Sequence, residues 1–560
     1  MPPIDAFDTH DGHLPHGICT SSHPGGTVSK PRKKLQVIVC VLFVELFERF
    51  TFFGIVCNMI LFCTIKLGYS SYQAAMVNTC FVGASVLTPV LVGWFAETCL
   101  GRTTVLCFCA LLHFFGTALL PVVAFPFEDF YINTHNIVHR LEPHEQHILF
   151  YTGLVAVALG IGGIRAILCP MAAYHLQGCD QHQLLSFFNW FYWLVNLNST
   201  VVFLGIAYIQ QSVAKNLCFL IPFTSVLLAL IAIHMVHNKL TFRPKKGNNK
   251  LYKKLLTVVN LFLNSLKMCC LHYRHLSGDV ANWLDRAKEN NGGRYSETSV
   301  ENVKILVKLF PLFGLQLLYR ACITQIPSGY YLQTMHSNLK LNGFLLPVAV
   351  MKVISILPVL ILAPLLDALL LYKLHFPTAM GHACAALSAL LAGISEIHRK
   401  NYPQVEQTLS GKVLHVSSMT CFQLTPQYIL LGVAEAFVTP ACTNLRGVSL
   451  HFLTLSYGGG CFLGAFLIHF LYFVSGGNFY PNNLSSGNME RFFFTLATLM
   501  AINTLVFWRI SQRYTDLSVE LSSGAGHSHL YEKLLQYKTC LRFYDTLDRS
   551  DTLTSMETVL

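Results

Sequence analysis

The sequence predicts an all-α membrane protein with twelve transmembrane helices, divided into two six-helix halves. The first observation is composition: the 560 residues are 53% hydrophobic and only 12% charged, whereas a soluble protein carries roughly 25% charged residues. The second is a set of twelve apolar runs, each close to the roughly 20 residues that a spanning helix needs. The third is a basic segment at 238–302, which separates the first six runs from the last six.

The apolar runs set the expected order of the helices along the chain. Polar segments separate the apolar runs, and charged residues are rare inside the apolar runs. The predicted spans are 35–65, 75–96, 103–125, 147–172, 185–209, 216–237, 303–326, 344–371, 376–396, 420–443, 449–474 and 490–511.

The basic residues predict the orientation. The segment 238–302 is rich in Lys and Arg, and loops of this kind stay on the cytoplasmic side of a membrane. An even number of spans then places both termini in the cytoplasm. The loop 475–489 falls on the opposite side and contains a glycosylation sequon that begins at Asn483. The pattern leaves open whether the membrane is the plasma membrane or an endolysosomal one.

Two six-helix halves joined by a long cytoplasmic segment are typical of the major facilitator type of transporter. In such proteins the substrate site lies between the halves near the middle of the membrane. We expect membrane lipid as a partner and a monomeric protein. The expected parts are a disordered cytoplasmic tail at 1–34, an N-terminal six-helix bundle at 35–237, a basic linker with an amphipathic helix at 238–302, a C-terminal six-helix bundle at 303–511 and a cytoplasmic tail at 512–560.

Charge and residue spacing exclude several other classes of function. The net charge of +11 is explained by the basic cytoplasmic segments, so we expect no nucleic-acid partner. The 19 cysteines are scattered through the apolar runs as small hydrophobes, and neither they nor the 24 histidines have the spacing of a metal site. The sequence contains no nucleophile elbow or phosphate loop. It therefore predicts that the protein is not an enzyme and needs no metal or cofactor.

Three charged residues interrupt the first apolar run. Glu45, Glu48 and Arg49 are three and four positions apart, so a helix places them on one face, close enough to pair. Each such charge costs about 2.5–3.5 kcal/mol at the centre of a spanning helix. Packing alone does not explain that cost, although a static buried ion pair is the simpler alternative. The cluster predicts an inward-facing site for a proton or a charged solute.

Several motifs occur in the order found in the proton-coupled oligopeptide transporters, solute carrier family 15. The chain resembles this family over about residues 35–511, and the peptide/histidine branch is among the nearest relatives. The motifs run from Glu45 to Gly54, from Gly93 to Arg102, from Ser186 to Leu197, from Pro364 to Asp367 and from Gln427 to Glu435.

The resemblance implies roles for particular residues. The cluster of Glu45, Glu48 and Arg49 would serve proton coupling, with the proton on Glu45 or Glu48. Arg49 and Arg165 would contact the carboxylate of the substrate, and Glu435 its amino group. The same comparison places two further residues at the substrate, Phe53 and Asn196, and a gating pair at two helix ends, Lys308 and Asp367.

The chain also departs from the family pattern. Val56 stands where other peptide carriers have an Arg, Thr324 lies near a position that is often acidic, and the connection that follows Glu435 is short. Two functions therefore stay open. The first is a proton-coupled symporter of di- and tripeptides or of amino-acid-like solutes such as histidine, working by alternating access. The alternative is a degenerate carrier that binds a solute as a sensor or scaffold without transporting it.

Overall fold

The computed structural model describes most of the helical part of the chain. The described residues are 31–96, 101–124, 142–175, 193–213, 218–237, 260–261, 263, 283–291, 295–369, 375–443 and 448–523. Most of the predicted amphipathic helix in the linker lies outside them, as do most of the two tails.

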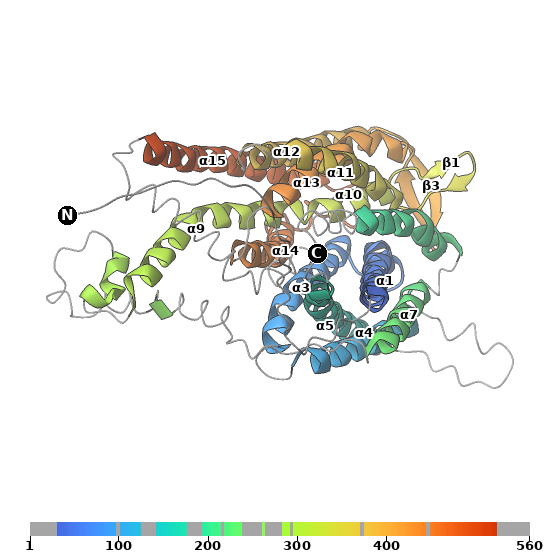
Figure 1. Cartoon of the computed structure of the whole chain (residues 1–560). Coiled ribbons are helices and arrows are strands. Elements are labelled where there is room, and N and C mark those ends of the chain that lie inside the picture. The colour runs from blue at the N-terminus through green and yellow to red at the C-terminus, as the bar shows by residue number, and fades with distance from the viewer. Residues whose placement is uncertain are drawn as a thin grey trace, which may run out of the picture.

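The helices of the first half pack on one another. In Figure 1 they form the blue-to-green group at the lower right, where α1, α3, α4, α5 and α7 are labelled. Their bounds are α1 (Pro31–Val56), α2 (Met59–Ile65), α3 (Ser71–Phe95), α4 (Arg102–Ala124), α5 (Pro143–His175) and α7 (Leu220–His237). Between α5 and α7 runs the helix Trp193–Val213, which contains the π-helical turns η3 (Val202–Ile206) and η4 (Ile209–Val213).

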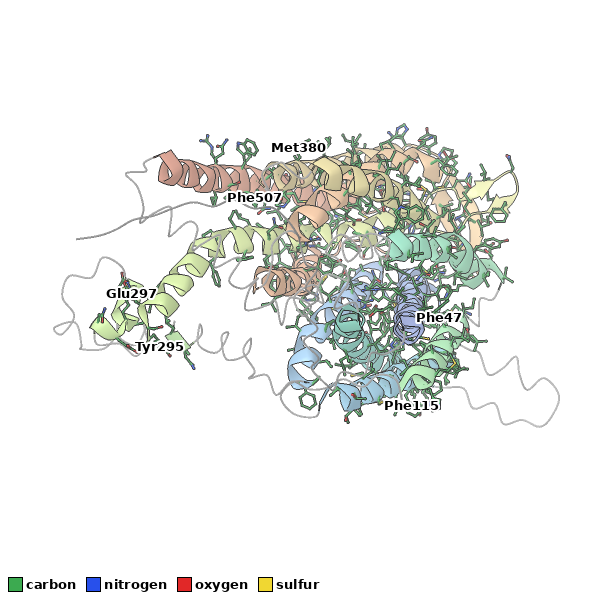
Figure 2. The ribbon with its side chains drawn as sticks, viewed as in Figure 1. Phe47, Phe115, Tyr295, Glu297, Met380 and Phe507 are labelled. Atoms are coloured by element: carbon green, nitrogen blue, oxygen red, sulfur yellow. The ribbon has the colours of Figure 1, made fainter. Side chains whose placement is uncertain are left out.

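The helices of the second half form the yellow-to-red group above them in Figure 1, and the start of α9 projects away from both groups. Their bounds are α9 (Glu297–Ile323), α10 (Ile326–Met335), α11 (Val350–Leu369), α12 (His375–Lys400), α13 (Thr425–Thr443), α14 (Val448–Val474) and α15 (Met489–Ser523). Tyr295 and Glu297 mark the projecting end of α9 in Figure 2, far from Met380 and Phe507.

Short elements complete the connections. Two antiparallel hairpins occur in the second half, and 3-10 turns precede α9 and α13. The bounds are β1 (Lys340–Leu341), β2 (Phe344–Leu345), β3 (Gln404–Leu409), β4 (Lys412–Ser417), η6 (Trp283–Ala287), η7 (Glu289–Asn291) and η8 (Cys421–Leu424).

All twelve predicted spans fall on helices, so the all-α prediction is confirmed. Eight helices in the described part are long and apolar enough to cross a membrane by length and composition. Some boundaries were wrong: α11 begins later than predicted, α13 begins only after η8, and α15 continues to Ser523.

The seventh predicted span, 303–326, ends close to where α9 ends, and it is followed by a further short helix, α10, that the sequence did not predict. α9 ends at Ile323 and α10 begins at Ile326, with Pro327 in its first turn. Proline lacks the backbone N–H that a continuous helix would bond to the carbonyl four residues earlier. The same residue is well suited to a first helical turn. The break therefore has a local cause that hydropathy does not detect.

One end of the molecule joins the two halves. We call it the sealed end; it is formed by the connections 66–70, 336–349, 401–424 and 475–488. Among the described residues, every hydrogen bond between the halves lies toward this end. The donors and acceptors are Tyr331 and Asn58, Asn78 and Ser328, Gln211 with Leu346 and with Val348, Ser410 and Gln211, and Ser71 and Asn482.

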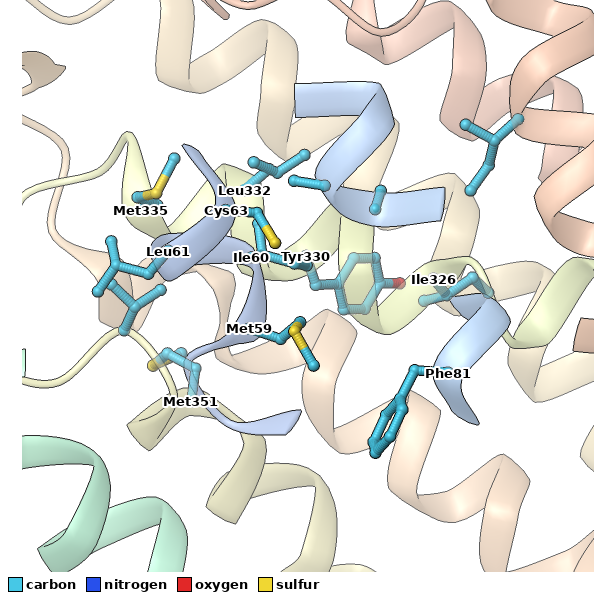
Figure 3. Close-up of a cluster of buried hydrophobic side chains, with 14 of the residues drawn as sticks. Met59, Ile60, Leu61, Cys63, Phe81, Ile326, Tyr330, Leu332, Met335 and Met351 are labelled. Carbon is cyan, nitrogen blue, oxygen red and sulfur yellow. The ribbon is translucent and has the colours of Figure 1, made fainter. Parts of the chain in front are cut away.

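An apolar cluster lies beneath these hydrogen bonds. Figure 3 shows side chains from both halves meeting there: Met59 and Cys63 of α2 and Phe81 of α3 lie near Tyr330 of α10 and Met351 of α11. Burial of such side chains contributes about 25 cal/mol per Å² of apolar surface. The polar clamps and this cluster together close the molecule at the sealed end.

Candidate functional site

Polar contacts hold α1, the helix that carries the charge cluster, against its neighbours. The Asn198 side chain donates a hydrogen bond to the Leu46 carbonyl at 2.9 Å. The buried Thr51 hydroxyl pairs with the Ser225 hydroxyl of α7. These contacts on either side of Glu48 fix the rotation of α1, so that the face with the carboxylates points into the first half.

Glu48 and Arg165 form a buried ion pair between α1 and α5. Arg165 Nε lies 3.1 Å from each carboxylate oxygen, and Nη2 lies 2.8 Å from Oε1. Arg49 Nε approaches Glu48 Oε2 at 3.5 Å. Glu48 is 1% exposed and Arg165 8% exposed. One carboxylate thus lies between two guanidinium groups, an arrangement in which the loss of either partner leaves a buried charge uncompensated.

Close packing of α5 places Arg165 at this point. A Cβ atom on Gly160 would lie 2.5 Å from the Cβ of His113 on α4, and one on Gly163 would lie 2.5 Å from the Cβ of Cys109. Only glycine permits that approach between helices, a device common in membrane bundles. The glycines that precede Arg165 in the sequence therefore act by bringing α5 against α4.

Aromatic rings border the ion pair. The Arg165 guanidinium lies 4.9 Å from the centre of the Phe52 ring, a cation–π contact. Phe52 also stacks on Phe81 of α3, with 6.0 Å between ring centres. The Phe53 ring lies 5.5 Å from the Phe52 ring and 5.9 Å from the Phe203 ring, in a cluster that includes Ile356 of the second half. Phe53 therefore lies between the two halves, in the region where the resemblance implies a substrate.

Glu45 lies one helical turn before Glu48 and is 3% exposed. Its Oε1 atom is buried and has no hydrogen-bond partner among the described residues. A buried carboxylate oxygen without a partner is costly while the group is ionised, and protonation removes most of that cost. Glu45 is thus suited to hold a proton beside the Glu48–Arg165 pair.

In the second half, Glu435 of α13 has a basic partner. Lys352 Nζ of α11 lies 3.5 Å from Glu435 Oε1. A Cβ atom on Gly432 would overlap the backbone carbonyl of Ser355, so α11 and α13 touch one turn away from the pair. This partner on another helix was not predicted from the sequence. About one third of its side chain is exposed, which keeps it accessible to a solute.

Arg320 is a second basic residue that the sequence analysis did not select. It lies in the last turn of α9, and its guanidinium is 4.9 Å from the centre of the Tyr457 ring on α14. A Cβ atom on Gly460 would lie 2.5 Å from the Cβ of Arg320, which shows how closely α14 packs on α9 here. A lone Lys or Arg within an apolar run is the signal that would have identified Lys352 and Arg320.

The other predicted site residues have mixed outcomes. The Asn196 carbonyl accepts hydrogen bonds from the Ser199 and Thr200 hydroxyls, and its role at the substrate stays a prediction. Lys308 and Asp367 lie in helical segments of α9 and α11, but their side chains are outside the described part of the chain. The gating pair therefore stays a prediction.

The glycosylation sequon lies at the sealed end. Asn483 is exposed, and its side-chain oxygen accepts a hydrogen bond from the Ser485 amide at 3.1 Å. This short turn displays the asparagine at the surface.

The paired charges inside two groups of packed apolar helices define a membrane transporter of the major facilitator type. Residues 102–445 match the family model described as the POT family. The chain is 51% identical to human solute carrier family 15 member 5, an alignment that covers 98% of each protein. It is 26% identical to mouse solute carrier family 15 member 3, covering 86% of this chain and 92% of that one. The chain therefore belongs to the POT family, as a solute carrier of the peptide transporter type.

Solved structures agree with this assignment at the level of the fold. The POT family transporter PepTSo superposes with a TM-score of 0.63 at 19% identity, covering 87% of this chain and 99% of that one. The peptide transporter POT in complex with sulfate superposes with a TM-score of 0.59 at 16% identity, covering 87% and 96%. At such identities the likeness concerns the arrangement of helices alone.

Proposed function

We propose that the protein is a proton-coupled symporter that carries di- and tripeptides, or amino-acid-like solutes such as histidine, by alternating access. The observation that carries this proposal is the buried Glu48 carboxylate, which lies between Arg165 and Arg49. Family membership supports the peptide class of substrate. Glu48 is a carboxylate that can take up a proton, and its protonation would free the guanidinium groups of Arg165 and Arg49 to bind another anion.

The proposed coupling is a change of partner for Arg165. Arginine does not deprotonate in proteins, so the proton must go to a carboxylate. When Glu48 takes up a proton, its negative charge is lost and its attraction for Arg165 and Arg49 falls. The carboxylate of a substrate then replaces Glu48 as the anion. When the proton leaves Glu48, the internal pair re-forms and the substrate is released.

Glu435 has the complementary role in the second half. A carboxylate is the group that an ammonium ion requires, and Glu435 is partly exposed. In the absence of substrate Lys352 neutralises Glu435. The amino group of a peptide would compete with Lys352 for this carboxylate while the peptide carboxylate contacts Arg165. Substrate would thus bridge the two halves of the carrier.

The sequon at Asn483 and the basic segment 238–302 support an orientation with the sealed end outside the cytoplasm and both termini inside it. In this orientation the described conformation is closed to the outside. The six hydrogen bonds between the halves and the apolar cluster beneath them would form the outer gate, which must open once in each transport cycle.

The alternative of a non-transporting sensor rests on Val56, on Thr324 and on the short connection that follows Glu435. Val56 packs against the main apolar cluster at a position where other peptide carriers have an Arg. Binding would then persist without transport. Counterflow separates the two functions, because a sensor would bind labelled peptide but would not exchange it across a membrane.

Uptake by purified protein in liposomes tests the proposal. A thermal-shift screen first identifies a binding peptide, since a ligand stabilises the state it binds. Labelled peptide should then accumulate when the outside is more acidic than the inside, and a protonophore should abolish the accumulation. Glu48→Gln should lose accumulation but keep counterflow. Uptake that ignores the pH gradient, or a Glu48→Gln protein that accumulates peptide like the parent, would contradict proton coupling.

A further inference from the structure

Arg320 is a partly buried cation whose charge no acidic side chain in the described part of the chain balances. Arg165 and Arg49 contact Glu48, and Lys352 contacts Glu435. Arg320, in contrast, contacts aromatic rings: its guanidinium is 4.9 Å from the Tyr457 ring centre and 5.8 Å from that of Tyr319. Its Nε atom is buried and has no hydrogen-bond acceptor among the described residues.

This arrangement is costly unless a further group completes it. A cation–π contact is worth about 0.5–2 kcal/mol, and it does not supply the acceptor that the buried Nε donor lacks. A hydrogen-bond donor that is buried without an acceptor destabilises the protein. The missing partner for Arg320 is an anion with oxygen acceptors, and a carboxylate matches the planar guanidinium.

The position of Arg320 relates it to the substrate site. The Tyr457 side chain that contacts it also lies within electrostatic range of Glu435 in the same half and of Arg165 in the other half. Gly460, one turn after Tyr457, brings α14 against α9 at Arg320. Arg320 is therefore near the groups proposed to bind both termini of a peptide, but it is not needed for either terminus.

The balance of charges in the site also favours an anionic partner for Arg320. Among the described residues, its cations are Arg49, Arg165, Arg320 and Lys352, and its carboxylates are Glu45, Glu48 and Glu435. Four cations thus face three carboxylates, and protonation of a carboxylate widens the difference. A zwitterionic peptide adds no net charge. A solute with one additional carboxylate supplies the negative charge that Arg320 lacks.

We propose that Arg320 is a specificity residue that binds a second carboxylate of the solute, so that the carrier prefers acidic peptides and acidic amino-acid-like solutes to neutral ones. This inference rests on the proposed peptide-carrier function. The inference adds acidic solutes as a class of substrate, and it assigns recognition of their second carboxylate to one residue on α9. The aromatic contacts with Tyr319 and Tyr457 hold the guanidinium in place for this role.

Paired ligands that differ by one charge test the inference. Dissociation constants would be measured on the detergent-solubilised full chain for the dipeptides Ala-Glu and Ala-Gln, and for glutarate, a dicarboxylate without an amino group. The parent should bind Ala-Glu at least about tenfold more tightly than Ala-Gln, the ratio expected when a charge-assisted hydrogen bond is lost. Arg320→Met should lower this ratio to near one, and Arg320→Lys should keep part of it.

Each outcome separates this inference from the proposed function. Equal binding of Ala-Glu and Ala-Gln by the parent, or a ratio that survives in Arg320→Met, would overturn the role of Arg320 while leaving the peptide carrier intact. Binding of glutarate alone, lost in Arg320→Met, would support Arg320 and overturn the peptide class. If none of the three ligands binds, both are overturned. If Arg320 had only a structural role, Arg320→Met would weaken the binding of both dipeptides equally. The ratio of the two dissociation constants therefore tests the role of Arg320 even if the variant is less stable.

Discussion

Arg165 on α5 contacts both carboxylate oxygens of Glu48 on α1, with Nε 3.1 Å from each oxygen and Nη2 2.8 Å from Oε1. The two residues are 117 positions apart in the sequence, and both are buried. The contact therefore holds two helices of the first half together and also sets the charge state of the site. Any event that neutralises Glu48 alters the packing of α1 on α5 and frees a guanidinium at the same moment.

Removal of one member of this pair should destabilise the protein more than removal of both. Arg165→Met leaves Glu48 with Arg49 alone, and we expect the free energy of unfolding to fall by about 3–5 kcal/mol, as for other broken buried pairs. The double variant Glu48→Met/Arg165→Met should recover part of that loss. Thermal denaturation in detergent measures both. Additive losses in the double variant would show that the two side chains are not coupled.

The close approach of α5 and α4 should not tolerate a methyl group. Gly160→Ala places a Cβ atom 2.5 Å from the Cβ of His113, so we expect a loss of about 1–3 kcal/mol from overpacking. Gly205→Ala is the matched control, because no atom lies within 4 Å of a Cβ there. It should leave stability unchanged or raise it by up to about 1 kcal/mol, through higher helix propensity. Equal effects of the two changes on the melting temperature would refute the packing argument.

Gln211 should hold the sealed end closed. It is 1% exposed, its Nε2 donates to the Leu346 carbonyl at 3.1 Å, and its Oε1 accepts from the Val348 amide at 2.9 Å. Gln211→Ala removes both bonds, worth about 2 kcal/mol together. We expect the equilibrium to shift toward opening at this end by up to about thirtyfold.

The rate at which an impermeant maleimide labels a cysteine introduced at Ser410 reports this opening. Ser410 is part of the same clamp, because its hydroxyl donates to the Gln211 carbonyl. Gln423→Ala is the control, since Gln423 is an exposed glutamine at the same end. Faster labelling in Gln211→Ala alone supports the clamp, and equal labelling rates in the parent and both variants would rule it out.

The stability of the sealed end should depend on the protonation of His336, which follows α10. Burial, together with the nearby charge of Arg399, lowers the pKa of His336 from an ordinary value of 6.5 to about 4, although the bond from His336 Nδ1 to the Leu332 carbonyl acts in the opposite direction. The unfolded chain therefore binds a proton at a higher pH than the folded one. Stability should be complete above about pH 7 and fall as the pH drops from 6.5 toward 4.

By pH 5 this group alone should cost about 1–2 kcal/mol. His336→Gln cannot take up the proton, so its melting temperature should fall less than that of the parent between pH 7.5 and pH 5. An equal fall in the two proteins would assign the acid sensitivity to other groups.

Sequence reasoning predicted the parts of this molecule that depend on local composition. Apolar runs of sufficient length predicted where the spanning helices lie, and the cost of charge in a membrane identified Glu48, whereas Arg165 was implied by the resemblance to the family. The pairing of Glu435 with Lys352 was missed because it depends on the contact of α11 with α13 at Gly432, which brings together residues 83 positions apart in the sequence (435 − 352 = 83). The short helix α10 was not predicted, because its 10 residues are fewer than a membrane span needs.

Proton movement measured together with peptide entry tests the account most directly. Liposomes that contain the protein and an internal pH-sensitive dye would receive a binding peptide from outside, with no initial pH gradient. The account predicts that the interior acidifies as peptide enters, and that Glu48→Gln abolishes the acidification while counterflow of peptide continues. Peptide entry without acidification in the parent, or acidification in Glu48→Gln equal to that of the parent, would contradict the role of the Glu48–Arg165 pair in coupling.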